Sequence, residues 1–296
     1  MKGAIRLMAC AAAVLCVMAI IGSSAAGMDV SGGMRVYRGP KEIYEEKGSF
    51  DSAVIGAKAK PKPPSGPQPD PSVDKWAVVI GISDYRGRQY DLQYCDDDAR
   101  DMYNYLLSRG YPAGNIKLLL DGNATAKNIM AALDWLNSWE GPNSEVVIFY
   151  SGHGSTYDGY NDGDAEYTDE AIVSSDLYLI LDGQLRQKLS TFSSKKITLI
   201  FDSCFSGGMD DLNGNGRVVV AACGETEYSY DGTSAQQNGV FTYYFVGSET
   251  AGLQTYNVVE SAFAYAAPLA HDFVASQYGG NMNPVMYDMY SGDWCF

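Results

Sequence analysis

The chain has 296 residues, of which 46% are apolar and 19% charged. This composition is typical of a globular protein and provides enough apolar residues for a sizeable core. The 36 Asp and Glu residues outnumber the 21 Lys and Arg residues, and the net charge of -15 disfavours binding to nucleic acid or anionic lipid. Basic substrates and metal ions are therefore the expected partners.

Residues 1–26 have the pattern of an export signal. Lys2 and Arg6 flank an apolar stretch from 7 to 21, and small residues at 24–26 offer a cleavage site before Gly27. The alternative is an uncleaved N-terminal membrane anchor, because the stretch approaches the roughly 17 residues that just span a bilayer. In both cases we expect the protein to be exported, extracellular or on the outer face of the cell membrane.

Residues 27–74 have little periodicity and include a proline-rich run at 60–71, so they are predicted to be a linker or pro-segment. From residue 75 to 296 we expect one domain in which short apolar runs alternate with helical patterns. This alternation is typical of an α/β fold with a largely parallel sheet covered by helices. About six strands are expected, at 76–82, 115–120, 145–150, 196–202, 217–222 and 284–287.

Four helices are expected between these strands. The first covers 96–109 and has acidic residues in its first turn, and the second begins after Thr125 as its cap. A third should run from Asp182, as its cap, to about residue 192. The last covers 258–276 and is expected to be interrupted at Pro268.

Two buried strands each lead directly into a short segment of small residues around a reactive side chain. His153 lies in Ser-Gly-His-Gly, and Cys204 lies in Asp-Ser-Cys-Phe-Ser-Gly-Gly. Ligands bind at the carboxyl ends of strands in open α/β sheets, so both side chains should project from one edge of the sheet. A cysteine nucleophile needs a base, which His153 can supply, while the N–H groups of Gly154 and Cys204 could face an acyl oxyanion.

A lone cysteine is more often a buried inert thiol than a nucleophile. The matching histidine segment reverses that expectation for Cys204, whereas Cys95 and Cys223 could both belong to the core. His271, the other histidine, lies in a helical pattern and is expected to be a surface or satisfied helix residue. Four cysteines beyond the signal do not make a disulfide scaffold, although one bridge between Cys223 and Cys295 is conceivable.

The two segments resemble those of the caspase-like peptidases, and most closely those of metacaspases. The resemblance covers roughly residues 75–288 and includes the segments at 77–85, 95–99, 168–176 and 239–242. It implies a three-layer α/β sandwich and a cysteine endopeptidase with Cys204 as nucleophile and His153 as base. One departure is Phe205, because metacaspases usually carry a histidine after the nucleophile.

The resemblance also implies a pocket for the residue before the scissile bond, lined by Asp98, Ser151 and Asp202. Acidic walls favour Lys or Arg there, and leaving a buried charge unpaired costs about 2–5 kcal/mol, enough for a strong preference. The alternative for Asp202 is a strand-end carboxylate that only holds backbone amides.

Calcium is a further expectation. No Lys or Arg occurs between Lys127 and Arg186, and acidic residues crowd the loop expected after His153, namely Asp158, Asp162, Asp164, Glu166, Asp169, Glu170 and Asp176. Many metacaspases need calcium, which takes oxygen ligands, but the sequence assigns none. The Asp-x-Asn-x-Asn-Gly run at 211–216 resembles a calcium loop but lacks its closing Glu, so a polar surface turn is the preferred interpretation.

The sequence therefore predicts a monomeric cysteine endopeptidase that cleaves proteins or peptides after Lys or Arg through a thioester. Calcium would activate it without taking part in the chemistry. Two alternatives remain open: a catalytically inactive caspase-like scaffold, and a transpeptidase in which an amine replaces water at the same acyl-enzyme.

Overall fold

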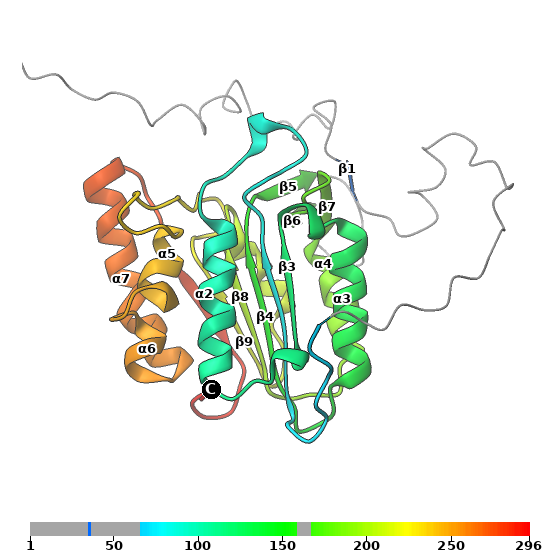
Figure 1. Ribbon diagram of the computed structural model, residues 1–296. Coiled ribbons are helices and arrows are strands. Elements are labelled where there is room, and N and C mark those ends of the chain that lie inside the picture. The colour runs from blue at the N-terminus through cyan, green and yellow to red at the C-terminus, as the bar shows by residue number, and fades with distance from the viewer. Residues whose placement is uncertain (1–34, 37–65, 159–166) are drawn as a thin grey trace, which may run out of the picture.

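The structure is a computed structural model that describes residues 35–36, 66–158 and 167–296 (Figure 1). The expected export signal and most of the proline-rich segment lie outside the described residues. Residues just before the first strand of the domain are held by Asn115. The Asp70 N–H donates to Asn115 Oδ1 at 2.7 Å, and Asn115 Nδ2 donates to the carbonyls of Asp70 and Val73.

A six-stranded sheet forms the centre of the molecule, in the order β10-β9-β8-β4-β2-β3. All neighbouring strands are parallel except β10, which is antiparallel to β9. The strands are β2 (Lys75–Gly81), β3 (Ile116–Leu120), β4 (Glu145–Ser151), β8 (Ile197–Asp202), β9 (Arg217–Ala221) and β10 (Val285–Asp288). The predicted fold class and all six predicted strands are confirmed.

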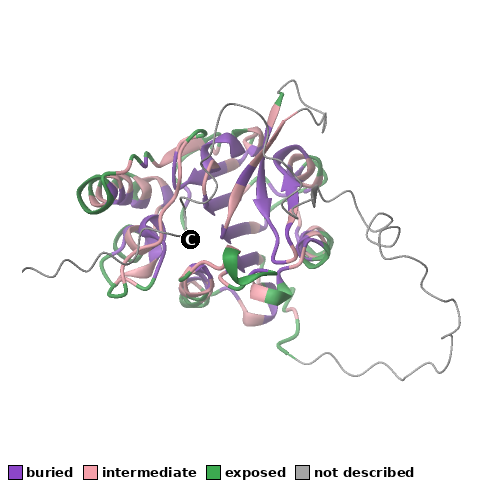
Figure 2. Ribbon diagram, turned by 90° about the horizontal axis from the view of Figure 1, so that it is seen from above, coloured by how far each residue is buried: buried purple, intermediate pink, exposed green. Residues whose placement is uncertain are grey.

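Helices cover both faces of this sheet, giving three layers (Figures 1 and 2). Val78 and Ile80 of β2 pack in the core beneath α3 (Ala126–Trp139) and α4 (Asp182–Leu189). Ala77 and Val79 pack in the opposite core, beneath α2 (Cys95–Ser108) and α7 (Val259–Tyr278). Successive strand residues point to opposite faces, so a strand buried on both sides is expected to be largely apolar; every residue of β8 is buried, and only Thr198 and Asp202 in it are polar.

Short helical segments complete the domain. They are η2 (Arg88–Tyr90), η3 (Ala113–Asn115), η4 (Asp121–Asn123), η5 (Ser206–Leu212), α5 (Val240–Thr242), η6 (Tyr243–Gly247) and α6 (Gly252–Tyr256). The predicted cap of α3 is confirmed, because Thr125 Oγ1 accepts the Asn128 N–H at 3.3 Å.

A second sheet has the order β1-β7-β6-β5, and two of its strands, β5 and β6, lie in the segment for which we expected an acidic loop. Strands β5 (Gly154–Asp158), β6 (Thr168–Val173) and β7 (Tyr178–Leu181) are antiparallel to one another, and β1 (Arg35–Val36) pairs parallel to β7. The loop prediction was wrong over β5 and β6, because the polar residues of these two strands hide the apolar alternation that indicates a strand. Asp162, Asp164 and Glu166 lie outside the described residues.

Two helix predictions were also wrong in detail. Helix α7 continues through Pro268. Pro268 and Ala264 are both exposed, so water can hydrogen bond the Ala264 carbonyl that the proline cannot satisfy. Asp182 is the first residue of α4 and not its cap, which is Leu181, and the helix ends at Leu189.

The cysteines of the described domain are all reduced. Cys223 is buried and Cys295 is exposed, so the conceivable bridge between them does not form. Cys95 and Cys223 are buried, as expected of core residues. Within the described ranges, no helix combines the length and hydrophobicity needed to cross a membrane.

Candidate active site

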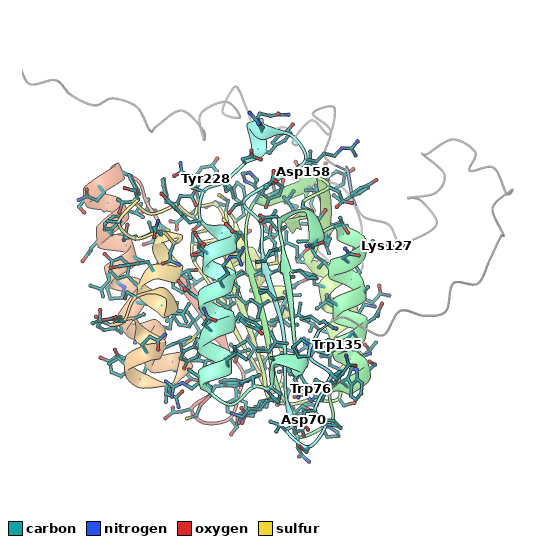
Figure 3. All side chains as sticks on the ribbon, in the orientation of Figure 1. Asp70, Trp76, Lys127, Trp135, Asp158 and Tyr228 are labelled. Atoms are coloured by element: carbon teal, nitrogen blue, oxygen red, sulfur yellow. The ribbon has the colours of Figure 1, made fainter. Side chains whose placement is uncertain are left out.

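The register of two neighbouring strands brings His153 and Cys204 together. Ser151 at the end of β4 pairs with Asp202 at the end of β8, and the Gly152 N–H donates to the Asp202 carbonyl at 3.2 Å. Each reactive residue follows its paired strand residue by two positions, so both leave the sheet at its carboxyl edge. This is the end of the molecule where Asp158 and Tyr228 lie in Figure 3.

The backbone of Gly154 lies directly against that of Cys204. A Cβ atom at residue 154 would come within 1.8 Å of the Cys204 carbonyl oxygen, so only glycine fits. Val173 N–H donates to the His153 carbonyl, which makes Gly154–Ile172 a non-hydrogen-bonded pair of the antiparallel ladder. The Gly154 N–H therefore points away from β6, outside the ladder, as the predicted oxyanion donor must.

The His153 ring is held by a backbone carbonyl. Its Nε2 lies 2.8 Å from the Tyr90 carbonyl oxygen, which can only accept, so Nε2 carries the proton and Nδ1 is left as an acceptor. Burial lowers the pKa of His153, and the Tyr90 carbonyl opposes that shift. The neutral imidazole is thus the form present at neutral pH, with Nδ1 ready to act as a base.

The Cys204 thiol faces the Ser229 carbonyl oxygen at 3.8 Å. Burial, and to a smaller extent the nearby Cys223, raises the pKa of Cys204 to about 12. Both side chains are described, and no hydrogen bond joins them. The resting dyad is therefore a neutral thiol beside a neutral imidazole, and the thiol must turn from Ser229 towards Nδ1 before its proton can be transferred.

The segment 223–231 forms one wall beside the nucleophile and is braced by Glu227. The Glu227 carbonyl accepts the Phe205 N–H at 2.8 Å, and its carboxylate accepts the N–H groups of Gly224 and Asn283. Phe205 adopts a left-handed conformation with φ of 62°, and its ring contacts Tyr228 edge-on at 5.2 Å. An aromatic pair thus occupies the position beside the nucleophile where the related peptidases usually carry a histidine.

The three predicted pocket residues also meet. Asp98 Oδ2 accepts the Ser151 hydroxyl at 2.7 Å, and Asp98 Oδ1 accepts the Gly239 N–H at 2.9 Å. Asp202 Oδ2 accepts both the N–H and the hydroxyl of Thr242. A Cβ atom at residue 239 would lie 2.6 Å from Asp202 Oδ2 and 3.0 Å from Asp98 Oδ2, so both carboxylates converge on this glycine.

These carboxylates lie in an environment that disfavours their charge. Burial raises the pKa of Asp98 well above its usual range, and the neighbouring Asp202 raises it further. Burial raises the pKa of Asp202 too, against hydrogen bonds from Ser229 and Thr242. A third carboxylate, Asp231, has a pKa raised to about 6, chiefly by burial. In the described part of the chain, no Lys or Arg forms an ion pair with any of the three.

Sequence reasoning missed four residues of this pocket, which are Ser229, Asp231, Gly239 and Thr242. Ser229 donates to Asp202, and Asp231 pairs through its backbone with Gly239. The resemblance of 239–242 to the metacaspase segment was a usable signal for the last two. Ser229 and Asp231 lie in irregular chain, where no periodicity predicts which way a side chain points.

The acidic residues that led us to expect calcium lie in different surroundings. Asp169 and Glu170 are buried in β6, and Asp176 accepts the Ala126 N–H at 2.9 Å. Asp211 forms an ion pair with Arg186 at 3.1 Å, and η5 leads into a turn at Gly216, in agreement with the polar turn preferred for 211–216. The described residues contain no group of three or more His, Cys, Asp or Glu side chains that could hold a metal ion.

Comparison with known proteins agrees with this geometry. The profile of the caspase domain family (Peptidase C14) matches residues 74–266. Metacaspase-3 of Arabidopsis thaliana is 27% identical over 223 residues, covering 66% of this chain and 61% of that protein. Metacaspase-6 of the same plant is 40% identical over 148 residues, covering 46% of this chain and 39% of that protein.

A solved structure of a protein from Geobacter sulfurreducens superposes with a TM-score of 0.53 over 72% of this chain and 92% of that chain, at 17% identity, and so supports the fold alone. The chain spans between about a third and three fifths of the length of the Arabidopsis metacaspases it matches. The fold, the strand-end Cys and His and the profile match define the class of protein. The chain belongs to the caspase domain family of peptidases.

Proposed function

We propose that this protein is a cysteine endopeptidase that hydrolyses peptide bonds after Lys or Arg. The observation that carries the proposal is the group of carboxylates beside Cys204, in which Asp98 and Asp202 are buried without a cationic partner in the described chain. A buried charge is costly unless it is paired. A Lys or Arg side chain of a substrate would supply the missing positive charge.

The chemistry follows from the dyad. Cys204 Sγ transfers its proton to His153 Nδ1 as it attacks the scissile carbonyl, and the Gly154 and Cys204 N–H groups stabilise the oxyanion. The imidazolium then gives its proton to the leaving amine, which leaves a thioester on Cys204. Water, deprotonated by Nδ1, hydrolyses the thioester and restores the thiol. The Tyr90 carbonyl accepts from Nε2 throughout, so Nδ1 remains the nitrogen that takes up and releases the proton.

Calcium activation and export belong to the same proposal. Support for calcium is the excess of carboxylates between His153 and Arg186, where no basic residue balances them. A hard cation would neutralise part of that charge. Support for export is the pattern of residues 1–26, with cleavage before Gly27 or retention as an anchor as the two forms. Melting temperatures with calcium and with chelator, and the mass of the mature N-terminus, test these two points.

The peptidase proposal is tested by hydrolysis of matched fluorogenic peptides that end in Arg, Lys or Asp, with calcium and with chelator. We expect cleavage of the Arg and Lys peptides and none of the Asp peptide, with complete loss in Cys204→Ala. Preference for Asp, or activity that survives Cys204→Ala, would overturn the site. Silence of the folded protein under every condition would favour a catalytically inactive scaffold.

A further inference from the structure

Two buried tyrosine hydroxyls converge on the peptide that carries His153. The His153 N–H donates to Tyr85 Oη at 2.7 Å, and Tyr150 Oη donates to the His153 carbonyl at 2.7 Å. Both tyrosines are almost wholly buried, Tyr85 at 3% and Tyr150 at 0% exposure. The N–H and the carbonyl of His153 are therefore each held by a buried tyrosine, one from the loop after β2 and the other from β4.

The hydroxyls also join this peptide to the second sheet. Tyr150 Oη lies 2.9 Å from the Val173 carbonyl and accepts the Val173 N–H at 3.2 Å. Val173 in turn donates to the His153 carbonyl at 3.0 Å. The His153 segment is thus fixed between β4 of the central sheet and β6 of the second one.

Gly152 shows how closely the hydroxyls approach. A Cβ atom at this position would lie 2.6 Å from Tyr85 Oη and 2.6 Å from Tyr150 Oη, so the two oxygens occupy the space that any side chain would need. The glycine before His153 is required by the tyrosines, and conformational freedom alone does not explain it.

The loop that carries Tyr85 also sets the orientation of the imidazole. The Tyr85 ring packs at 4.8 Å from the His153 ring, and the same loop supplies the Tyr90 carbonyl that binds Nε2. Asp91 Oδ1 accepts the Tyr85 N–H at 3.1 Å and thereby ties the two ends of the loop together. Burial raises the pKa values of Tyr85 and Tyr150 above their usual range, so both remain protonated.

We infer that Tyr85 and Tyr150 are positioning residues for His153, whose hydroxyls fix the His153 backbone so that Nδ1 faces Cys204. The inference rests on the proposed function, in which His153 is the base. Neither tyrosine touches substrate. Loss of either hydroxyl leaves a backbone N–H or C=O of the His153 peptide without its side-chain partner and lets the ring shift, and a shift of about 1 Å can cost roughly 100-fold in rate.

The test compares Tyr85→Phe and Tyr150→Phe with Tyr111→Phe. Tyr111 is a matched control because it is equally buried, its hydroxyl has no hydrogen-bond partner in the described chain, and it contributes to neither dyad nor pocket. We expect kcat on Arg peptides to fall about 10- to 100-fold in the first two variants, with KM within about threefold of wild type because the pocket is intact. Tyr111→Phe should behave as wild type.

A second readout needs no peptidase activity. The rate at which iodoacetamide alkylates Cys204, followed by mass spectrometry of the peptide that contains it, is measured against pH. We expect the profiles of Tyr85→Phe and Tyr150→Phe to move towards that of His153→Ala, whereas a purely structural role would leave the profile of the folded fraction unchanged.

The outcomes separate this inference from the proposed function. If wild type cleaves basic peptides and both variants match Tyr111→Phe in kcat and in alkylation, the inference is wrong and the function stands. If wild type cleaves nothing, the alkylation profiles still decide, and identical profiles for wild type and His153→Ala overturn the inference. Should one tyrosine variant fail to fold, the other carries the same test.

Discussion

The two ends of the central sheet differ in whether their carboxylates are paired with cations. At the amino end, Glu145 of β4 lies between Lys75 Nζ at 3.0 Å and Lys196 Nζ at 2.7 Å, and the lysines also lie over the rings of Tyr111 and Trp294. At the carboxyl end, the carboxylates of Asp98, Asp202 and Asp231 approach one another, and no described Lys or Arg pairs with them.

The difference supports the proposal that the carboxyl end binds the substrate. Paired charges hold a fold together, whereas buried like charges cost stability and persist where a ligand supplies the counter-charge. Strands β2, β4 and β8 run from one end of the sheet to the other. The apolar residues of these strands therefore do not explain why the carboxylates are paired at one end and unpaired at the other. The predictions below test this contrast, from the largest expected effect to the smallest.

Removal of the nucleophile should have the largest effect. Cys204→Ala is expected to lower kcat by at least about 10⁴-fold, because loss of a covalent nucleophile leaves only binding and oxyanion stabilisation. Cys295→Ala is the matched control, since that thiol is exposed and lies outside the site. Similar activity of the two variants on an Arg peptide would show that Cys204 is not the nucleophile.

Neutralising one carboxylate at each end gives a paired test. Asp202→Asn should lower kcat/KM for Arg peptides by about 30-fold to 1000-fold, because the cationic side chain loses its buried partner. Glu145→Gln should leave kcat/KM within about twofold but lower the free energy of unfolding by about 1–3 kcal/mol, since two lysines lose their partner. Kinetics and denaturant unfolding separate the two effects, and parallel loss of activity in both variants would remove the distinction between the ends.

The pKa of Asp231 predicts how stability depends on pH. Its folded pKa, about 6, lies above the ordinary 3.8, so the folded state binds the proton more tightly and stability falls as pH rises from about 4 to about 6. Asp231→Asn should remove that loss and raise the free energy of unfolding by on the order of 3 kcal/mol at pH 8. The gain should vanish below pH 4, and a variant that is less stable than wild type at pH 8 would contradict the account.

The smallest effect is expected when only one of the two lysines that pair with Glu145 is replaced. Lys196→Met should cost no more than about 1 kcal/mol, because Glu145 keeps Lys75 and the pair is partly exposed. Salt should reduce this cost, as it screens exposed ion pairs. Urea unfolding at low and high ionic strength measures this cost. A cost of several kcal/mol would contradict the view that the ion pairs at the amino end are ordinary, partly exposed pairs.

Much of the central sheet could be predicted from sequence because its strands are largely apolar on both faces, as in residues 197–201 of β8, where only Thr198 is polar. The strand-end placement of His153 and Cys204 followed from the same strands. Strands β5 and β6 could not be recognised, since Asp169 and Glu170 are polar yet buried. The orientation of Cys204 towards Ser229 depends on contacts between distant segments, which no local pattern encodes.

Some of the pocket residues could likewise be predicted from the sequence, and others could not. Asp98 and Asp202 lie on a helix and a strand of recognisable pattern, so their approach could be anticipated from the family resemblance. Asp231 and Ser229 lie in an irregular segment that Glu227 braces against Asn281 and Asn283, about fifty residues further along the chain. The sequence around these side chains has no pattern that predicts these contacts.

The most direct test of the central claim uses a substrate that differs from Arg only in charge. The kcat/KM values for matched peptides ending in Arg and in citrulline, its neutral isostere, are measured for wild type and for Asp202→Asn. The account predicts that wild type prefers Arg by at least about 100-fold and that the ratio collapses in the variant. A wild-type ratio near one, or a ratio that Asp202→Asn leaves unchanged, would contradict it.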